Sequence, residues 1–87
     1  MSLDEGKKIL RADALKEFEA AAKEGSAQLE AAEQQLKDAR DSQSAEAQQS
    51  AMKHLQETQA AGADKLKQIA ARFQEQVAAL ESLKNQQ

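Results

Sequence analysis

Side chains that commonly do chemistry in proteins are few along this chain and stand apart from one another. His54 is the only histidine and cysteine is absent, so a zinc site would lack most of its ligands. Asp13 and Glu17 are four residues apart, but paired carboxylates act as acid and base only inside a cavity. The serines are not accompanied by the histidine and aspartate of a nucleophile triad, and the glycines are isolated. We therefore expect no catalytic residue, metal site, cofactor or small-molecule substrate, and we predict that the protein is not an enzyme.

Charge and hydropathy narrow the classes of partner. The net charge is −3, and 12 basic residues are interspersed among 15 acidic ones, so no basic stripe is available for nucleic acid. No stretch approaches the roughly 20 apolar residues that span a membrane, and the mixed-sign polar face argues against a membrane-surface coat. The start of the chain lacks the basic-then-apolar layout of a signal peptide, so we expect a cytoplasmic protein; Met1-Ser2-Leu3 also has the form of a cloning leader.

Helix-forming residues dominate the composition, and helices must therefore build whatever surface the protein uses. Proline is absent, glycine occurs three times, and Phe18 and Phe73 are the only aromatic residues. Ala, Glu, Gln, Lys and Leu, which are abundant here, have the lowest free-energy cost in a helix. Residues that favour strands are too scarce to build a sheet. We predict an all-α fold in a single domain over residues 1–87.

Two runs of apolar or small residues alternate spacings of three and four, the pattern of a and d positions in a coiled coil. The first run extends from Leu15 to Ala39, and the second extends from Met52 to Leu83. The interaction seam that we predict from these runs consists of Leu15, Phe18, Ala22, Gly25, Leu29, Leu36, Met52, Leu55, Gly62, Leu66, Ile69, Phe73 and Leu80.

A break separates the two runs, because they are out of phase by two residues. The segment 41–44 is rich in helix-capping residues, and Glu46 follows it as an acid in the first turn of a new helix. Ser2 and Glu5 form a capping box that would start the first helix near residue 3.

We predict a first helix at about 3–41, a turn at about 41–45 and a second helix at about 45–84. One continuous helix of about 80 residues stays open as the alternative, because neither proline nor glycine marks the turn. Size complementarity favours an antiparallel two-helix coiled-coil hairpin, in which the numbers of paired residues would add to 91. Large side chains would then face small ones, as close packing requires. The expected pairs include Gly25 with Leu66, Leu29 with Gly62, Ala22 with Ile69, Ala39 with Met52, and Phe18 with Phe73.

A partner is expected because two helices bury only one narrow seam and are marginally stable alone. Ala63, Ala70 and Val77 widen the apolar stripe of the second helix, and we predict that they form an oligomer flank. Two hairpins that pair through such flanks give a homodimeric four-helix bundle. The alternative is that these alanines serve helix propensity alone and stay solvated.

Two glutamines, Gln59 and Gln76, occupy core positions of the second heptad run without an obvious hydrogen-bond partner in the hairpin. Buried polar residues at such positions can set register or oligomeric state. We favour the other interpretation, in which the glutamine ends reach solvent and Val77 faces the core beside Gln76.

The function that these patterns favour is that of a helical interaction or scaffolding module, acting through self-association or by docking the helices of another protein. The alternative is a small hairpin of the secretion or chaperone type that pairs with a different helical subunit. Small secreted helical hairpins with a Trp-x-Gly turn have this length, but the present chain has no tryptophan and its turn reads Asp41-Ser42-Gln43-Ser44.

Overall fold

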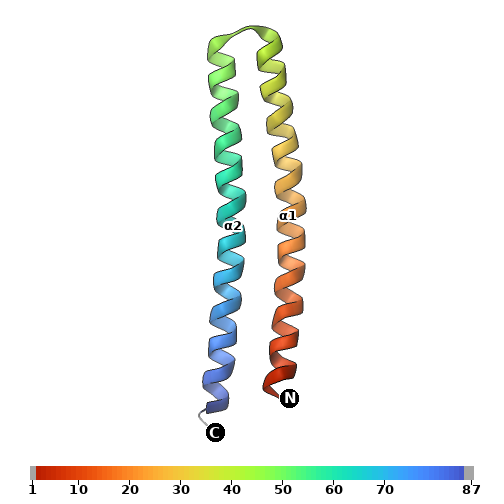
Figure 1. The fold of residues 1–87 in the computed structure, drawn as a ribbon, viewed down its shortest axis with the longest axis vertical. Coiled ribbons are helices and arrows are strands. Elements are labelled where there is room, and N and C mark those ends of the chain that lie inside the picture. The colour runs from red at the N-terminus through yellow and green to blue at the C-terminus, as the bar shows by residue number, and fades with distance from the viewer. Residues whose placement is uncertain (1, 86–87) are drawn as a thin grey trace.

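The computed structural model describes residues 2–85, which form two long α-helices joined by a tight turn (Figure 1). α1 spans Leu3–Ser42 and α2 spans Ala45–Asn85. The helices pack antiparallel in a rod 67 Å long, and both chain ends lie at the same end, which we call the open end. The predicted all-helical hairpin is confirmed, and residues 2–85 contain no strand and no unbroken helix through Ser44. Met1 and the tail Gln86-Gln87 lie outside the described residues.

Serine side chains cap the start of both helices. Ser2 has φ −77° and ψ 162°, and its Oγ accepts a hydrogen bond from the amide of Glu5 at 3.2 Å. The Oγ of Ser44 accepts from the amide of Ala47 at 3.3 Å. Each serine thereby satisfies one of the amide donors that a helix leaves unpaired at its first turn. Both helices start within one residue of the positions expected from the capping patterns.

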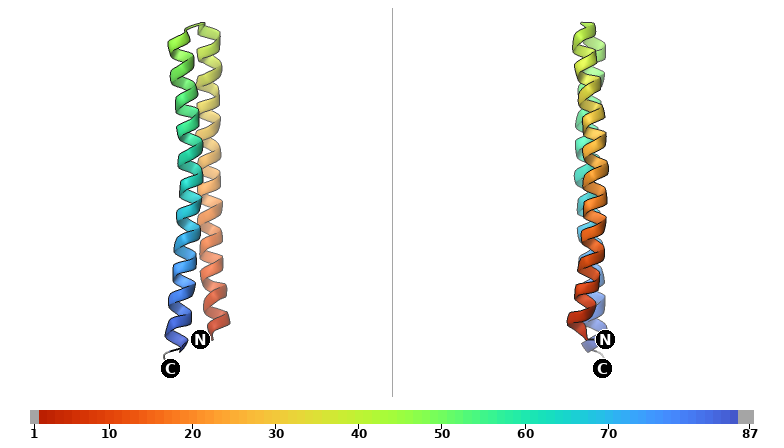
Figure 2. Two further views of the ribbon diagram at one scale, coloured as in Figure 1. Left: turned by 60° about the vertical axis from the view of Figure 1, so that its left-hand side comes forward. Right: turned by 90° about the vertical axis from the view of Figure 1, so that its right-hand side faces the viewer.

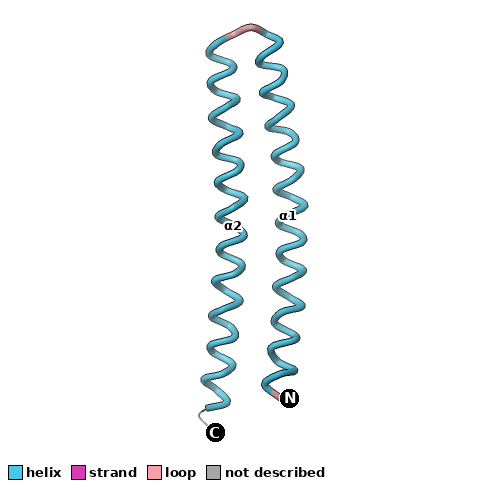
Figure 3. The backbone as a smooth tube through the Cα atoms, in the orientation of Figure 1, coloured by secondary structure: helices cyan, strands magenta, loops and turns pink. Residues whose placement is uncertain are grey.

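The turn is two residues long because Gln43 adopts a left-handed backbone conformation, with φ 60° and ψ 19° (Figure 3). Its amide donates to the carbonyl of Arg40 at 3.2 Å, which closes the last turn of α1. The hydroxyl of Ser42 donates to the carbonyl of Ala39 at 2.7 Å and accepts from the amide of Ser44 at 3.4 Å. These hydrogen bonds reverse the chain without a glycine or a proline.

Burial recurs along each helix every eleven residues rather than every seven. On α2 the repeat passes through Ala51, Gly62 and Phe73, and on α1 it passes through Ala21 and Ala32. An eleven-residue repeat corresponds to about 3.67 residues per turn, close to that of a straight helix, whereas a strict seven-residue repeat imposes a left-handed supercoil. The two helices accordingly run nearly straight beside each other (Figure 2).

The short turn gives the helices a register different from the predicted one. The numbers of the ion-paired residues Lys7 and Glu81 add to 88, and those of Glu17 and Arg72 add to 89, instead of 91. Because α1 ends at residue 42 and α2 begins at residue 45, the point of reversal lies close to 43 and 44. A turn of this length leaves no slack for the predicted offset.

The predicted packing of leucines over the two central glycines does not occur. A Cβ atom built on Gly25 or on Gly62 would meet no heavy atom within 4 Å outside the local backbone. Neither Leu66 nor Leu29 therefore fills the space into which a side chain at those positions would point. The expectation was wrong because it depended on the heptad phase and on the register of 91.

Small side chains make up most of the buried core. Among residues 2–85, the buried apolar residues are Ala14, Ala32, Leu36, Ala39, Ala51 and Ile69. Leu36, Ala39 and Ala51 form a cluster beside the turn, with Ala47 and Leu55 packed against it. The narrow seam lets the helices approach closely but covers few bulky side chains.

Gln43→Gly is expected to stabilise the hairpin by about 0.5–1 kcal/mol, because glycine adopts the left-handed conformation without the clash that a side chain introduces. The same substitution at Gln56, which is exposed in the middle of α2, is the matched control and should destabilise by a similar amount. Urea denaturation followed by circular dichroism measures both free energies of unfolding. Destabilisation by both substitutions would contradict the role assigned to Gln43.

Candidate functional site

The predicted seam residues fall into three environments. Leu36 and Ile69 are buried. Those that are half-buried along the contact between the helices are Phe18, Gly25, Leu29, Leu55, Gly62, Leu66, Phe73 and Leu80. Leu15, Ala22 and Met52 are exposed, with exposed fractions of 57% for Leu15 and 41% for Met52. The hairpin therefore brings most of the predicted seam together and leaves these three residues outside.

The three outliers follow from the phase of the buried stripe. On α1, Ala14 and Ala21 take the places expected for Leu15 and Ala22, and on α2 Ala51 takes the place expected for Met52. A straight helix drifts by about 20° per heptad from a strict seven-residue repeat. Over several heptads, the side that faces the other helix therefore moves from one residue to its neighbour.

The two core glutamines of the heptad pattern lie outside the core for the same reason. Gln59 and Gln76 are exposed, and the buried stripe passes through Thr58 and Val77 instead. The hydroxyl of Thr58 donates to the carbonyl of His54 at 2.8 Å, which satisfies it within its own helix. The favoured interpretation, in which the glutamine ends reach solvent while Val77 turns toward the core, agrees with these exposures.

The predicted oligomer flank contributes in part to the hairpin itself. Ala70 and Val77 are half-buried, and only Ala63 is exposed. Small side chains in a row bury little area against a partner, so an association surface needs bulkier neighbours. Met52 is the one large exposed hydrophobic residue on α2 outside its last turns, within residues 2–85.

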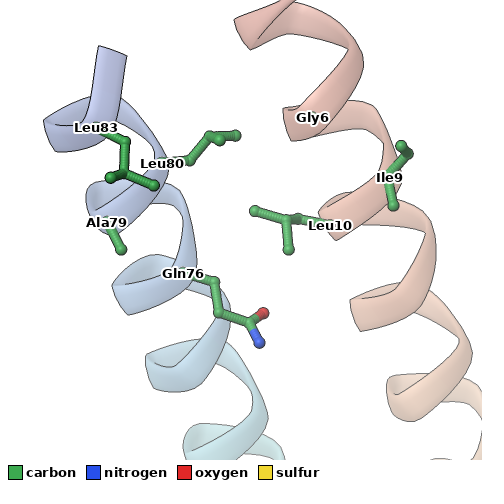
Figure 4. A pocket seen from close by; sticks show the side chains of 7 residues that line it. All are labelled: Gly6, Ile9, Leu10, Gln76, Ala79, Leu80 and Leu83. Atoms are coloured by element: carbon green, nitrogen blue, oxygen red, sulfur yellow. The ribbon is translucent and has the colours of Figure 1, made fainter. Parts of the chain in front are cut away.

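An apolar groove lies between the helices at the open end (Figure 4). It is lined by Gly6, Ile9, Leu10, Gln76, Ala79, Leu80 and Leu83, and we call this set the open-end groove. Leu10 and Leu80 extend toward the facing helix, and none of the seven residues is charged. Ile9 and Leu83 have exposed fractions of 51% and 62%, so the groove presents bulky apolar side chains to solvent.

Gly6 allows the two helices to meet closely at the base of the groove. A Cβ atom built on Gly6 would lie 2.7 Å from Cδ2 of Leu80, closer than a real contact permits. Leu80 therefore packs directly over the backbone of α1. The packing of a leucine over a glycine, which the sequence pattern predicts for the middle of the hairpin, occurs here instead.

A polar depression continues the groove toward the middle of the rod. Leu10 and Gln76 line both, and the depression adds Asp13, Glu17 and Arg72. The guanidinium of Arg72 donates to the carboxylate of Glu17 and links the two helices on this face. Exposed ion pairs of this kind contribute at most about 1 kcal/mol to stability, so the pair chiefly marks which residues share the face.

The opposite face of the open end carries charge instead of leucines. Lys7 Nζ lies 2.8 Å from Glu81 Oε1, and both residues line a depression together with Arg11, Phe73 and Val77. This face includes the Val77 end of the predicted flank. The open-end groove is therefore the stronger candidate for a docking surface.

Most of the groove was missed by the heptad pattern, and only Leu80 belongs to the predicted seam. Ile9 and Leu10 precede the first heptad run, which begins at Leu15. The signal that was available is the four-residue spacing of Gly6, Leu10 and Ala14, which places all three on one face of a helix.

Other kinds of site find no support in the described part of the chain. No group of three or more His, Asp or Glu side chains that could hold a metal ion occurs between residues 2 and 85. His54 is exposed. Neither α1 nor α2 includes a segment with the length and apolar character needed to cross a membrane.

The chain matches no protein-family model, no curated protein and no solved structure. Its function must therefore be inferred from its residues and their arrangement.

A glycine-to-alanine series tests the close contact at the base of the groove. Gly25→Ala and Gly62→Ala should each stabilise the hairpin by about 0.5–1 kcal/mol, because alanine favours the helix and its Cβ meets open space. Gly6→Ala should fall at least about 1 kcal/mol below them, because its Cβ displaces Leu80. Urea unfolding of the three variants measures this, and an equal gain at all three positions would contradict the contact.

Proposed function

We propose that this protein is a non-enzymatic helical interaction module that packs its hairpin against further helices, either those of a second copy or those of another protein. The observation that carries the proposal is the open-end groove, in which Ile9 and Leu83 stay 51% and 62% exposed. An uncharged surface on which bulky apolar side chains gather is typical of protein contact sites.

The distribution of burial supports this function. Four of the six buried apolar residues within 2–85 are alanines, whereas Leu10, Phe18, Phe73 and Leu80 are only half-buried. Complete burial of one such bulky side chain contributes about 1.5–3 kcal/mol. A hairpin that leaves several of them partly in water gains stability when another helix covers them.

The architecture suits this role because two further helices laid on one face of a hairpin complete a four-helix bundle. The two helices are about 40 residues long and nearly straight, so a partner helix could follow them through many turns. In such a bundle the hairpin supplies two helices and the partner supplies the others. Coiled-coil packing across the new contacts is part of this proposal.

Site-specific photo-cross-linking tests the proposed function. A photoreactive amino acid replaces Leu83 in the groove, and in a matched variant it replaces Lys23, which is exposed on α1. Illumination of cells that express the chain should yield adducts with a second polypeptide mainly from position 83. An adduct of two copies indicates self-association, and an adduct with a different helical protein indicates a subunit of the secretion or chaperone type.

The control for specificity is Ile9→Glu, which places a charge in the groove without changing the cross-linking position. It should abolish the adduct from position 83, because a buried unpaired carboxylate opposes docking. Adduct yields at position 83 that do not exceed those at position 23, or that persist with Ile9→Glu, would contradict the proposed function.

A further inference from the structure

We infer that the occupant of the open-end groove is a second copy of this chain, laid parallel to the first with both open ends together. In this dimer, α1 of each copy faces α2 of the other. The inference rests on the proposed function and adds the identity and the orientation of the partner. It is carried by the signs of the charges on the groove face and by the position of the groove at one end of the rod.

The charges beside the groove differ in sign between the two helices. The polar depression that continues the groove is lined by Asp13 and Glu17 from α1 and by Arg72 from α2. Lys16 also lines it, so α1 contributes two acids and one base there, and α2 contributes a base. The α1 side of the groove face is therefore net acidic and the α2 side is basic.

The same signs repeat one step closer to the turn. Glu24 follows Glu17 by seven residues, and Lys65 precedes Arg72 by seven residues. Seven residues are nearly two full turns, so each residue returns to the same side of its helix. Because the helices are antiparallel, Glu24 and Lys65 also lie at similar heights along the rod. The groove face thus carries two successive levels of acid on α1 and base on α2.

Two identical faces can meet about a two-fold axis in two ways. With the axis across the rod, α1 meets α1 of the other copy, acidic sides oppose each other, and the two grooves lie at opposite ends. With the axis along the rod, α1 meets α2 of the other copy, acidic sides face basic sides at equal heights, and the two grooves coincide. Opposite charges favour the second arrangement and like charges disfavour the first.

The parallel arrangement also covers the side chains that the hairpin leaves in water. Ile9 and Leu83 line the groove from opposite helices, so Ile9 of each copy would approach Leu83 of the other. Glu17 and Arg72, already paired within each copy, would gain the opposite charge of the second copy as a neighbour. The apolar contact supplies affinity, and the charges set the orientation.

The face is large enough for a stable dimer. The rod measures 67 Å by 17 Å between Cα atoms, so one face presents about 1,100 Å², and a specific interface requires about 800 Å² per partner. The opposite face offers no comparable cluster among the described residues. Its exposed hydrophobic residues Leu15 and Met52 are separated along the rod, one in the open half and one near the turn.

Sedimentation equilibrium of the purified chain tests the identity of the partner. The unaltered chain should form dimers, and Ile9→Glu or Leu83→Glu should raise the dissociation constant by about a hundredfold or more. Met52→Glu, which alters an exposed residue outside the groove, and Ala63→Glu, which alters the predicted flank, should leave it unchanged. Circular dichroism at high concentration verifies that each variant is helical.

Distances between spin labels test the orientation. The chain has no cysteine, so single labels can be attached through Asp41→Cys at the turn end or Ser82→Cys at the open end, both exposed positions. In the parallel dimer, each label should lie within about 30 Å of its counterpart. In the antiparallel dimer, both labels would lie more than about 50 Å apart on a rod of 67 Å.

A charge exchange provides a test that does not depend on the groove variants. Glu17→Arg and Arg72→Glu each place like charges across the parallel dimer and should weaken it. Mixed in equal amounts, the two variants should form a heterodimer about tenfold more readily than either forms a homodimer, because opposite charges would then meet wherever position 17 of one copy faces position 72 of the other. The antiparallel arrangement predicts no such preference.

A monomer at all concentrations, long distances for both labels, or dissociation by Ala63→Glu but not by Ile9→Glu would each overturn the inference. If the purified chain is monomeric while position 83 cross-links to a different protein in cells, the second copy is excluded and the proposed function stands. If the chain forms no dimer and position 83 gives no adduct, both are excluded. Dimers with short label distances and sensitivity to Ile9→Glu support the inference.

Discussion

The structure depends on a narrow line of small residues along which two straight helices touch. Ala14, Ala32, Ala39 and Ala51 allow the helices to approach closely over the length of the rod. The line follows an eleven-residue repeat, so it keeps to one side of each straight helix from the turn to the open end. Such a contact brings long helices together with little bulky burial. Side chains too large for the seam, such as Ile9, are left on the surface.

The turn determines what meets across this line. Gln43 in a left-handed conformation and Ser44 as the cap of α2 reverse the chain within two residues, and the register of every later contact follows from that length. With this register Leu80 lies over Gly6 at the open end, where the close contact forms the base of the groove. A longer turn would move these contacts along the rod. Local hydrogen bonds at one end therefore shape the surface about 60 Å away.

Stability and association are linked in a protein of this shape. A hairpin with a core mostly of alanine has limited hydrophobic stabilisation of its own, and any helix that covers the groove stabilises the folded chain by mass action. The groove supplies apolar area, and the Glu17–Arg72 pair beside it supplies a directional charge pattern. This division between affinity and orientation requires no catalytic group, and it agrees with the scarcity of chemically active side chains in the sequence.

Local features were predictable from the sequence alone: two helices, their serine caps, the position of the turn, and the absence of recognisable catalytic motifs. Each depends on the properties of a few neighbouring residues. The choice of Ala14 over Leu15 and of Ala51 over Met52 as buried residues, and the open-end groove itself, were decided only by the tertiary structure. Repeats of seven and eleven residues differ by a small angle in each turn, and this difference changes which residue is buried only when it accumulates along a helix packed against another. Register likewise depends on the length of the turn, which two residues set through a backbone conformation that their side chains do not announce.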